Sequence, residues 1–332
     1  MPSTELIKVV LNFLILSTVL MMGSECKDSL VSVSVIFRNG NREPTEHEKH
    51  GSLGRLTEVG KHRLERLGEM LQHRYSKFLR EEPGFFTKST NTERTKMSLQ
   101  MVLSGIRPQY NWKDWPVEID DRNIISPRWD PTYKRLSNQL NKEDKVSKKM
   151  KKFSKDLKKL ADCTGQRIST PEDMHTLYHR FMADWSVGDR LPTCTQGYFP
   201  QGELFDGVMF AYDTFSWTTE MRRINGGKFL NEFIENVKQM KKDKEKKLFL
   251  YSSHDDLLVA VMKILDIFEP HVPGYSNALV LEVYRDNDTY NVQVLYYDGR
   301  TQHFEEKEML KKCKRCRFKD FVGTLRKKGV IP

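Results

Sequence analysis

The spacing of hydrophobic positions along the chain changes several times from the period of a strand to the period of a helix, which predicts strands followed by helices. Residues 30–37 (LVSVSVIF) alternate and then become continuously apolar, as expected for a strand in a buried sheet. Residues 56–79 carry apolar side chains at helical spacing, which predicts a long amphipathic helix. The same change from strand to helix recurs at 84–106 and at 246–265.

This alternation, with long connections, predicts an α/β fold: a doubly wound, mostly parallel sheet with helices on both faces. Two strand-like runs around residue 287 predict an antiparallel hairpin. Residues 121–225 have few strand signals and many Pro, Trp and Lys residues. We therefore expect a mainly helical cap inserted between the two halves of an α/β core, residues 27–120 and 226–332.

The first residues have the order of a secretory signal peptide. One lysine precedes an apolar stretch at 8–22, and Ser24 and Cys26 are small residues at the −3 and −1 positions of a cut after Cys26. The stretch has about 14 apolar residues, too few for a membrane anchor, which takes roughly 20. We expect residues 1–26 to be removed and the protein to be secreted, extracellular and without a transmembrane anchor.

The cysteines agree with an oxidising compartment. Removal of Cys26 leaves an even set, which suits two disulfides. The sequence leaves three pairings open, of which the most local joins Cys163 to Cys194 and Cys313 to Cys316. The last two cysteines also have the spacing of half a zinc site, but no second Cys or His pair accompanies them, so we expect no metal.

One N-glycosylation sequon occurs in the chain, Asn287-Asp288-Thr289. It lies in the polar turn of the expected hairpin. Asn287 is therefore a candidate for glycosylation, since a glycan would fit in such a turn.

The chain is basic, with a net charge of +10 that becomes +11 when Lys8, Glu5 and Glu25 leave with the signal peptide. Much of this charge lies at 145–160, where apolar residues recur at helical spacing between lysines. That pattern predicts a surface helix with a solvated outer face. The alternative is attraction to an anionic glycan such as heparin, or to an anionic lipid surface. We expect no nucleic acid partner, because no recognised module occurs and the chain is expected outside the cell.

Polar residues follow three of the expected strands. RNGNR follows Phe37, TKST follows Phe86, and SSHD follows Tyr251. Ligands of α/β sheets bind beyond the carboxyl ends of the strands. The three polar segments are therefore expected to converge on one site.

The residue types in these segments suit an anionic ligand. Arg38 and Arg42 offer planar guanidinium groups that match phosphate or carboxylate oxygens, and Lys88 adds a point charge. His254 and Asp255 add a ring nitrogen and a carboxyl group that can donate a proton to a leaving group.

In this order the motifs resemble those of the histidine acid phosphatase family, in the branch of prostatic and lysosomal acid phosphatases. In that family the first strand ends in Arg-His-Gly-x-Arg-x-Pro; the His attacks phosphorus and the arginines clamp the phosphate. A later Arg in an Arg-Ser-Thr stretch joins them, and the Asp of a His-Asp pair protonates the leaving alcohol. The matching stretches here are RNGNREP, KSTNTERT at 88–95 and YSSHDD at 251–256.

Departures from the family pattern bear on catalysis. Asn39 stands at the position of the nucleophilic His, and its amide nitrogen shares its lone pair with the carbonyl. Lys88 stands where the third arginine is expected and lacks its bidentate geometry. Loss of a nucleophile typically costs on the order of 10⁶ in turnover. The resemblance therefore implies a pseudoenzyme with a vestigial site at Asn39, His254 and Asp255.

We expect the remaining pocket to bind a small molecule without a cofactor. An aromatic amine such as serotonin would pair with Asp255 and stack on cap aromatics, whereas an acidic lipid such as a leukotriene would pair with the basic residues. The protein resembles acid-phosphatase-like salivary proteins of blood-feeding insects, in which inactive members scavenge such host mediators. Weak residual acid phosphatase activity and action through the lysine-rich surface are the alternatives. The expected ligand-binding residues are Arg38, Asn39, Arg42, Lys88, His254 and Asp255.

Overall fold

The computed structural model describes residues 29–44, 54–111, 115–310 and 312–332. The expected signal peptide at 1–26 lies outside these residues. Within the described segments, every helix is too short or too polar to cross a bilayer.

Eight strands of the described chain form one sheet: β1 (Ser29–Arg38), β2 (Gly84–Ser89), β3 (Glu118–Ile119), β4 (Lys247–Ser253), β5 (Ala278–Asp286), β6 (Thr289–Asp298), β7 (His303–Lys307) and β8 (Arg315–Arg317). Their order is β3-β2-β4-β1-β5-β6-β7, and β8 pairs with β6. β1, β2, β3 and β4 are parallel, and all pairs from β1/β5 onward are antiparallel.

The predicted α/β class is confirmed, but the sheet is mixed rather than mostly parallel. The predicted hairpin is β5/β6, and β5 is also antiparallel to β1, with Ala278 opposite Phe37. The helix after β4 starts at the carboxyl edge of the sheet, and the loop that follows it returns to the same edge. β5 must therefore run in the opposite direction to β1.

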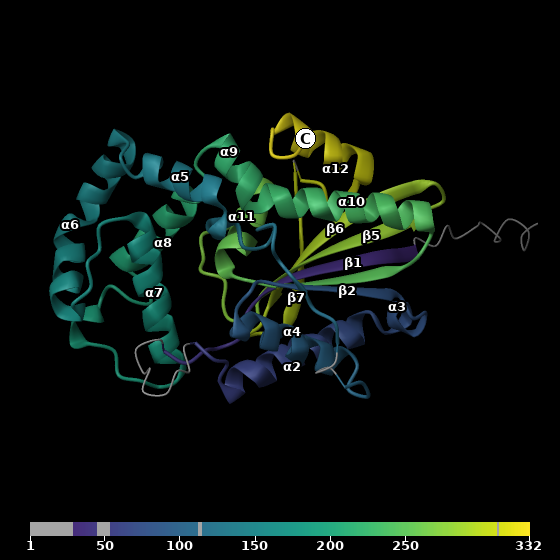
Figure 1. The fold of residues 1–332 in the computed structure, drawn as a ribbon, viewed down its shortest axis with the longest axis horizontal. Helices are drawn as coiled ribbons and strands as arrows, with labels where there is room; N and C mark the ends of the chain where they lie inside the picture. Colours follow the sequence, from purple (N-terminus) through teal and green to yellow (C-terminus); the bar gives the residue numbers. More distant parts are fainter. Residues whose placement is uncertain (1–28, 45–53, 112–114, 311) are drawn as a thin grey trace, which may run out of the picture.

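Helices cover both faces of the sheet and extend beyond its carboxyl edge (Figure 1). α2, α3 and α4 lie on one face, and α10, α11 and α12 on the other, while α5, α6, α7 and α8 form a helical cap beside the strand ends. The boundaries of core and cap, 121 and 225, stay a prediction. The helices are α2 (Glu58–Arg74), α3 (Ser76–Arg80), α4 (Glu93–Ile106), α5 (Pro131–Leu140), α6 (Asp144–Thr164), α7 (Pro171–Ser186), α8 (Glu203–Thr214), α9 (Thr219–Arg222), α10 (Lys228–Asp243), α11 (Asp255–Ile264) and α12 (Phe318–Lys327).

Residues of β1 pack on both layers of helices, which explains its apolar run. Val33, Val35 and Phe37 belong to the apolar cluster of α2 and α4, whereas Ile36 belongs to the cluster of α10 and α11. Burial on both faces fixes the register of this central strand, because a shift by one residue would exchange the two faces.

The parallel register brings the strand ends together, as predicted. Arg38 lies opposite Ser253 in the β1/β4 pair, and Ser89 lies opposite Ser252 in the β2/β4 pair. Just beyond the strands, the Asn39 N–H donates to the Ser253 carbonyl at 3.2 Å. The segments that leave β1, β2 and β4 therefore start side by side at one edge.

Both disulfides have the most local pairing, Cys163–Cys194 and Cys313–Cys316. The first joins Cys163, in the last turn of α6, to Cys194 in the segment before α8, and the second precedes α12. Asn287 is exposed in the β5–β6 turn, with a positive φ of 51°. Its glycosylation stays a prediction.

Two glycines bring α2 and α4 into close contact. A Cβ on Gly105 would lie 2.1 Å from the Glu65 carbonyl oxygen, and one on Gly68 would lie 2.2 Å from the Val102 carbonyl oxygen. These distances leave no room for a methyl group. The contact fixes α4, whose first turn carries Arg94 toward the site described below.

We expect Gly105→Ala to lower the free energy of unfolding by about 1–3 kcal/mol, because the helices must separate to admit the methyl group. The matched control is Gly323→Ala in α12, where a Cβ has open space and φ is helical. That change should be neutral or stabilising by up to about 1 kcal/mol. Urea unfolding of the three proteins measures both effects, and equal effects would contradict the close-packing argument.

Candidate anion-binding site

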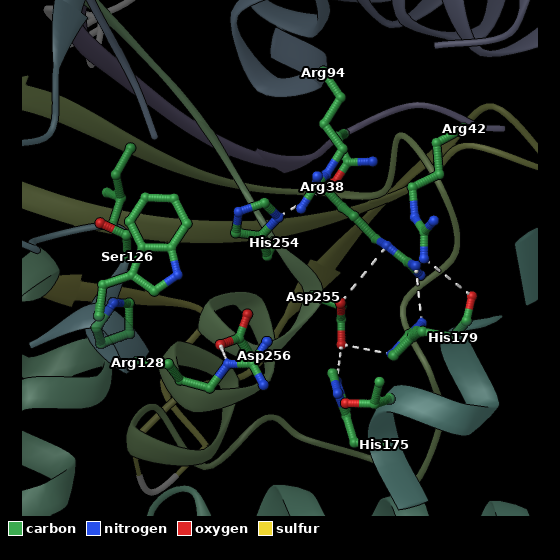
Figure 2. A pocket seen from close by; sticks show the side chains of 15 residues that line it. Arg38, Arg42, Arg94, Ser126, Arg128, His175, His179, His254, Asp255 and Asp256 are labelled. Atoms are coloured by element: carbon green, nitrogen blue, oxygen red, sulfur yellow. Dashed lines mark hydrogen bonds and ion pairs between the residues drawn. The ribbon is translucent and has the colours of Figure 1, made fainter. Parts of the chain in front are cut away.

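A cavity of about 260 Å³ opens where the strand ends meet the cap (Figure 2). It is lined by segments that lie far apart in the sequence: the loop after β1, the start of α4, the segment before α5, one face of α7 and the start of α11. The polar lining residues are Arg38, Asn39, Arg42, Arg94, Ser126, Arg128, His175, Thr176, His179, His254, Asp255 and Asp256.

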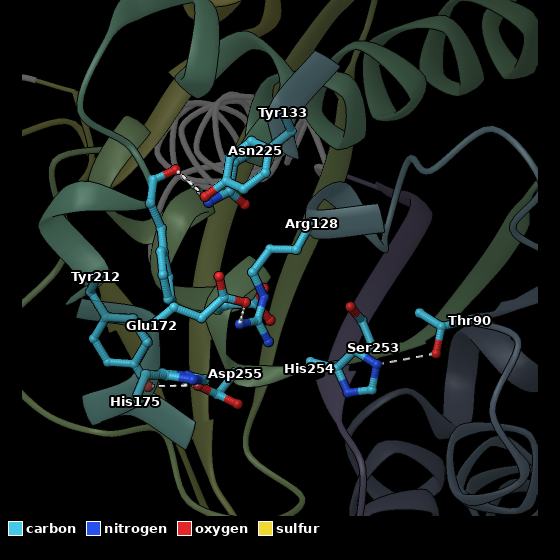
Figure 3. Close-up of polar contacts among 12 residues, drawn as sticks. Thr90, Arg128, Tyr133, Glu172, His175, Tyr212, Asn225, Ser253, His254 and Asp255 are labelled. Atoms are coloured by element: carbon cyan, nitrogen blue, oxygen red, sulfur yellow. Dashed lines mark hydrogen bonds and ion pairs between the residues drawn. The ribbon is translucent and has the colours of Figure 1, made fainter. Parts of the chain in front are cut away.

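Asn39 lines the cavity, and a hydrogen bond fixes the orientation of its amide group. Its Nδ2 donates to the Gly40 carbonyl at 2.9 Å, so Oδ1 faces His254 Nδ1 at 3.3 Å. An amide oxygen only accepts, so His254 donates from Nδ1, and Nε2 accepts from the Thr90 hydroxyl at 3.3 Å (Figure 3).

His254 is held in its neutral form. Burial, together with the charges of Arg94 and Arg128, lowers the pKa of its ring to about 3. The opposing charges of Asp256 and Asp255 do not compensate. A neutral ring matches the hydrogen bonds to Asn39 and Thr90, which leave both ring nitrogens occupied.

Asp255 has polar contacts with side chains of the cap and of β1 (Figures 2 and 3). Its Oδ2 accepts from the Tyr212 hydroxyl at 2.7 Å and from His175 Nε2 at 2.9 Å. His179 Nε2 lies 3.0 Å from the same oxygen, and Arg38 Nε lies 3.8 Å from Oδ1. Burial alone would raise the pKa of Asp255, but His179, His175 and Arg38 hold it well below its usual range. Asp255 is therefore an ionised acceptor.

The cluster of His175, His179 and Asp255 has the spacing of a metal site, with ligand-type atoms within 4.8 Å of one another. Arg38 Nη2, however, lies 3.1 Å from His179 Nδ1 and can only donate. Burial lowers the pKa of His179 to about 3, so the neutral ring carries its proton on Nε2. No lone pair on Nε2 then faces Asp255, which fits a hydrogen-bonded cluster better than a metal centre; the expectation of no metal stays a prediction.

Two guanidinium groups of the cavity have no carboxylate partner among the described residues. Arg42 reaches only the backbone carbonyls of Glu43 and His179, at 3.3 and 3.5 Å. Arg94 has no hydrogen-bond acceptor in the described chain. Burial and the nearby Arg42 and Arg38 lower the pKa of Arg94 to about 10, so it remains charged at neutral pH.

The positive charge of Arg128, by contrast, is compensated by two carboxylates. Asp120 accepts hydrogen bonds from two backbone N–H groups and from Ser126 Oγ, and thereby folds the segment that precedes Arg128. Arg128 Nε lies 2.8 Å from Asp256 Oδ2, and Nη1 lies 3.4 Å from Glu172 Oε1. Because Arg38 is likewise close to Asp255, the surplus positive charge of the cavity lies on Arg42 and Arg94.

Lys88 lies outside this cavity, which corrects the role expected for it. Its Nζ lies 2.8 Å from Glu232 Oε2 and 3.0 Å from Glu118 Oε1, and the residue is 1% exposed. Lys88 is still inside β2, on the face covered by α10, rather than beyond the strand end. Arg94, six residues later, brings a guanidinium group to the cavity from the first turn of α4.

The cavity therefore gathers five of the six expected residues and adds four that the sequence reading missed: Arg94, Arg128, His175 and His179. A signal for the histidines exists, since residues four apart lie on the same face of a helix. Arg94 stands within the KSTNTERT stretch that was already singled out.

Comparison with known proteins places the chain in a family. The family model of the histidine phosphatase superfamily (branch 2) matches residues 41–297. The venom acid phosphatase of Apis mellifera is 31% identical over 301 residues, which cover 81% of this chain and 78% of that protein. Human prostatic acid phosphatase is 26% identical over 356 residues, covering 95% of this chain and 90% of that protein.

Solved structures show the same fold. The phytase of Citrobacter braakii superposes with a TM-score of 0.66 at 15% identity, over 90% of this chain and 98% of that one. The chain therefore belongs to the histidine acid phosphatase family, within the histidine phosphatase superfamily (branch 2).

The low pKa values of His254 and His179 predict that the protein is less stable in acid. His254 and His179 have folded pKa values of about 3, below the value of about 6.5 for an unfolded chain. As the pH falls below about 6.5 the unfolded chain binds these protons first, so the free energy of unfolding falls by up to about 1.4 kcal/mol per pH unit for each histidine.

We therefore expect a lower free energy of unfolding at pH 5 than at pH 7.5, measured by urea unfolding. His254→Gln should reduce this difference, because one depressed pKa is removed. The exposed His73, changed to Gln, is the control and should leave it unchanged. Identical pH dependence of the two variants would contradict the assignment.

Proposed function

We propose that the protein is a secreted, catalytically inactive acid phosphatase relative whose former phosphatase cavity binds the anionic group of a small molecule and releases it unchanged. One observation carries the proposal: the unneutralised guanidinium groups of Arg42 and Arg94 converge beside Asn39, which has no nucleophilic atom. Charge-assisted hydrogen bonds from such groups hold phosphate or carboxylate oxygens.

Two features argue against turnover. Asn39 can form no phosphoenzyme, and its Oδ1 is the acceptor of the His254 N–H. Asp255, the acid of the family pattern, accepts hydrogen bonds from Tyr212 and His175 and lies beside His179 and Arg38, so it is held ionised and has no proton to give a leaving group. Nucleophile and acid are thus both missing.

The same contacts favour an acidic ligand over an amine. Asp255 and Asp256, which an ammonium group would need, are already paired with protein donors. The cavity also has an apolar side, formed by Ile125, Pro127 and Trp129. An acidic lipid such as a leukotriene would place its carboxylate on the arginines and its apolar part against these three residues. We propose that the protein scavenges host mediators of this kind.

The binding test uses isothermal titration calorimetry with inorganic phosphate and with leukotriene C4. Arg94→Met should weaken phosphate binding roughly 10- to 100-fold, because a charge-assisted hydrogen bond is lost. Arg66→Met, on the exposed surface of α2, is the matched control. Lys88→Met should also leave the affinity of the folded protein unchanged. Equal affinities of wild type and Arg94→Met would contradict an anion site here.

A hydrolysis assay separates binding from catalysis. We expect no release of p-nitrophenol from p-nitrophenyl phosphate by the wild type at about pH 5, on the argument that loss of a nucleophile costs on the order of 10⁶ in turnover. Turnover that is abolished by His254→Gln would establish the alternative, a residual acid phosphatase. Heat on titration with serotonin, lost in an Asp255→Asn variant, would favour the amine.

A second function, binding to a polyanionic glycan, is favoured by α6. Its apolar side chains are buried against the protein, so this face is not available to enter a lipid bilayer, and the lysines cover the other face. An extended row of ammonium groups suits a sulfated chain such as heparin. The exposed lysines are Lys145, Lys148, Lys149, Lys151, Lys152, Lys155, Lys158 and Lys159.

We expect the protein to bind a heparin column, because this row attracts sulfate groups. A variant with Lys148, Lys152 and Lys155 changed to Gln should elute at clearly lower salt. The control changes three exposed lysines elsewhere, Lys238, Lys242 and Lys244, and has the same net charge. Elution of both variants at the same salt concentration would show that net charge alone, and not α6, determines retention.

A further inference from the structure

A second cavity, of about 560 Å³, lies between the cap helices α7 and α8 and the carboxyl end of β6. Because β6 is antiparallel to β5, and β5 to β1, β6 ends at the same edge of the sheet as β1. Among the described residues, this cavity shares no lining residue with the one that contains Arg42 and Arg94. Its volume falls within the range of about 300–1,000 Å³ that is typical of small-molecule sites, which often lie between structural units.

Aromatic rings from both the cap and the core line this cavity. Tyr178 of α7 and Phe205 of α8 come from the cap, whereas Tyr296 of β6 and His271 come from the core. The two tyrosines are buried, and Phe205 and His271 are partly exposed. An apolar ring that entered the cavity would pack against side chains of both units, and its burial would supply the main part of the binding free energy.

The polar atoms of these rings are already paired within the protein. The Tyr178 hydroxyl donates to the Pro200 carbonyl at 3.1 Å. The Tyr296 hydroxyl accepts from Asn277 Nδ2 at 2.6 Å and lies 2.8 Å from His271 Nε2. The rings therefore offer carbon atoms rather than hydrogen bonds to a ligand, which favours an unsubstituted ring such as phenyl over a hydroxylated one.

Two opposite charges line the same cavity and are not paired with each other. Asp298, the last residue of β6, is partly exposed, and Arg300 is exposed, so a ligand can reach both side chains. Asp298 Oδ1 accepts from the Arg300 backbone N–H at 2.8 Å, and Oδ2 has no donor among the described residues. The Arg300 guanidinium has no acceptor in the described chain. These are the only Asp, Glu, Lys or Arg residues among the described lining residues, so their formal charges cancel.

We propose that this cavity binds an α-amino acid with an apolar aromatic side chain, of which phenylalanine is the simplest example. The ammonium group of the ligand pairs with Asp298, its carboxylate pairs with Arg300, and its ring packs against Phe205 and the two tyrosines. An α-amino acid carries both charges on one carbon atom, and so satisfies two residues of one turn at the same time. A ligand with one charge would leave one of the two groups unpaired. The site is separate from the anion site, so it does not rest on the function proposed above.

The test is equilibrium dialysis of the full chain with L-phenylalanine and with two analogues that each lack one charge, phenethylamine and 3-phenylpropanoate. We expect saturable binding of L-phenylalanine at one site. Each analogue should bind roughly 10- to 100-fold more weakly, because one charge-assisted hydrogen bond is lost. Absence of saturable L-phenylalanine binding, or equal affinities for the three probes, would overturn the proposal.

Two variants assign each charge of the ligand to its residue. Asp298→Asn keeps an acceptor for the Arg300 N–H and should weaken the binding of L-phenylalanine and phenethylamine, but not of 3-phenylpropanoate. Arg300→Met should weaken the binding of L-phenylalanine and 3-phenylpropanoate, but not of phenethylamine. A variant that merely damages the fold would weaken all three probes, and that result in both variants would contradict the assignment.

Controls separate this site from the anion site. Arg94→Met should weaken phosphate binding but keep the affinity for L-phenylalanine, so the two proposals fail separately. The measurements with 3-phenylpropanoate use Arg94→Met as the background, because a carboxylate would otherwise also bind at the anion site. Arg135→Met removes an exposed arginine of α5, outside both cavities, and should leave the affinities for all three probes unchanged.

Discussion

The position of the cap depends on one ionised carboxylate. Asp255 stands at the start of α11, directly after the end of β4, and accepts from His175 and Tyr212 of two cap helices. Arg38, at the end of β1, lies against the same group. Removal of one member of a buried charge pair strands the other and typically costs about 3–5 kcal/mol. The arrangement therefore holds the cap over the strand ends and creates the cavity between them.

The contacts that Asp255 makes with the cap also determine its protonation state. A carboxylate that accepts from His175 and Tyr212 and lies 3.8 Å from Arg38 keeps its charge while it anchors the cap, and the proposed loss of its role as an acid follows from that charge. The side chain of Asn39 is likewise used in a hydrogen bond within the protein, because its amide oxygen accepts from His254. Of the charged side chains that line the cavity, Arg42 and Arg94 have no carboxylate partner among the described residues, and both are cations. These two side chains are the basis for the proposed binding of an anion without cleavage.

The sequence predicts the parts of the fold that local patterns encode. The apolar run of β1 and the polar segments beyond β1 and β4 were placed correctly, since parallel strands must end at one edge. Lys88 was misplaced because a motif read as a string does not show which face of a strand a residue occupies. His175 and His179 were missed because they come from the cap, about 80 residues before Asp255, and only tertiary packing brings them together. The antiparallel half of the sheet was missed for a related reason, since the return of the loop after α11 is not a local property.

The backbone at Asn39 explains how a binding site can outlast catalysis. The frame of the cavity uses the main chain of this residue: its N–H donates to the Ser253 carbonyl at 3.2 Å, and its carbonyl accepts from the Ser276 N–H at 3.3 Å. These bonds are the same for His or Asn. Arg38 is held in the same way, through its N–H to the Asn277 carbonyl at 2.9 Å. Because the loop at 274–277 is tied to main-chain atoms, a change of the side chain at position 39 removes the nucleophile but leaves the arginines in place. This arrangement supports the function proposed above, in which turnover is lost while the anion site is kept.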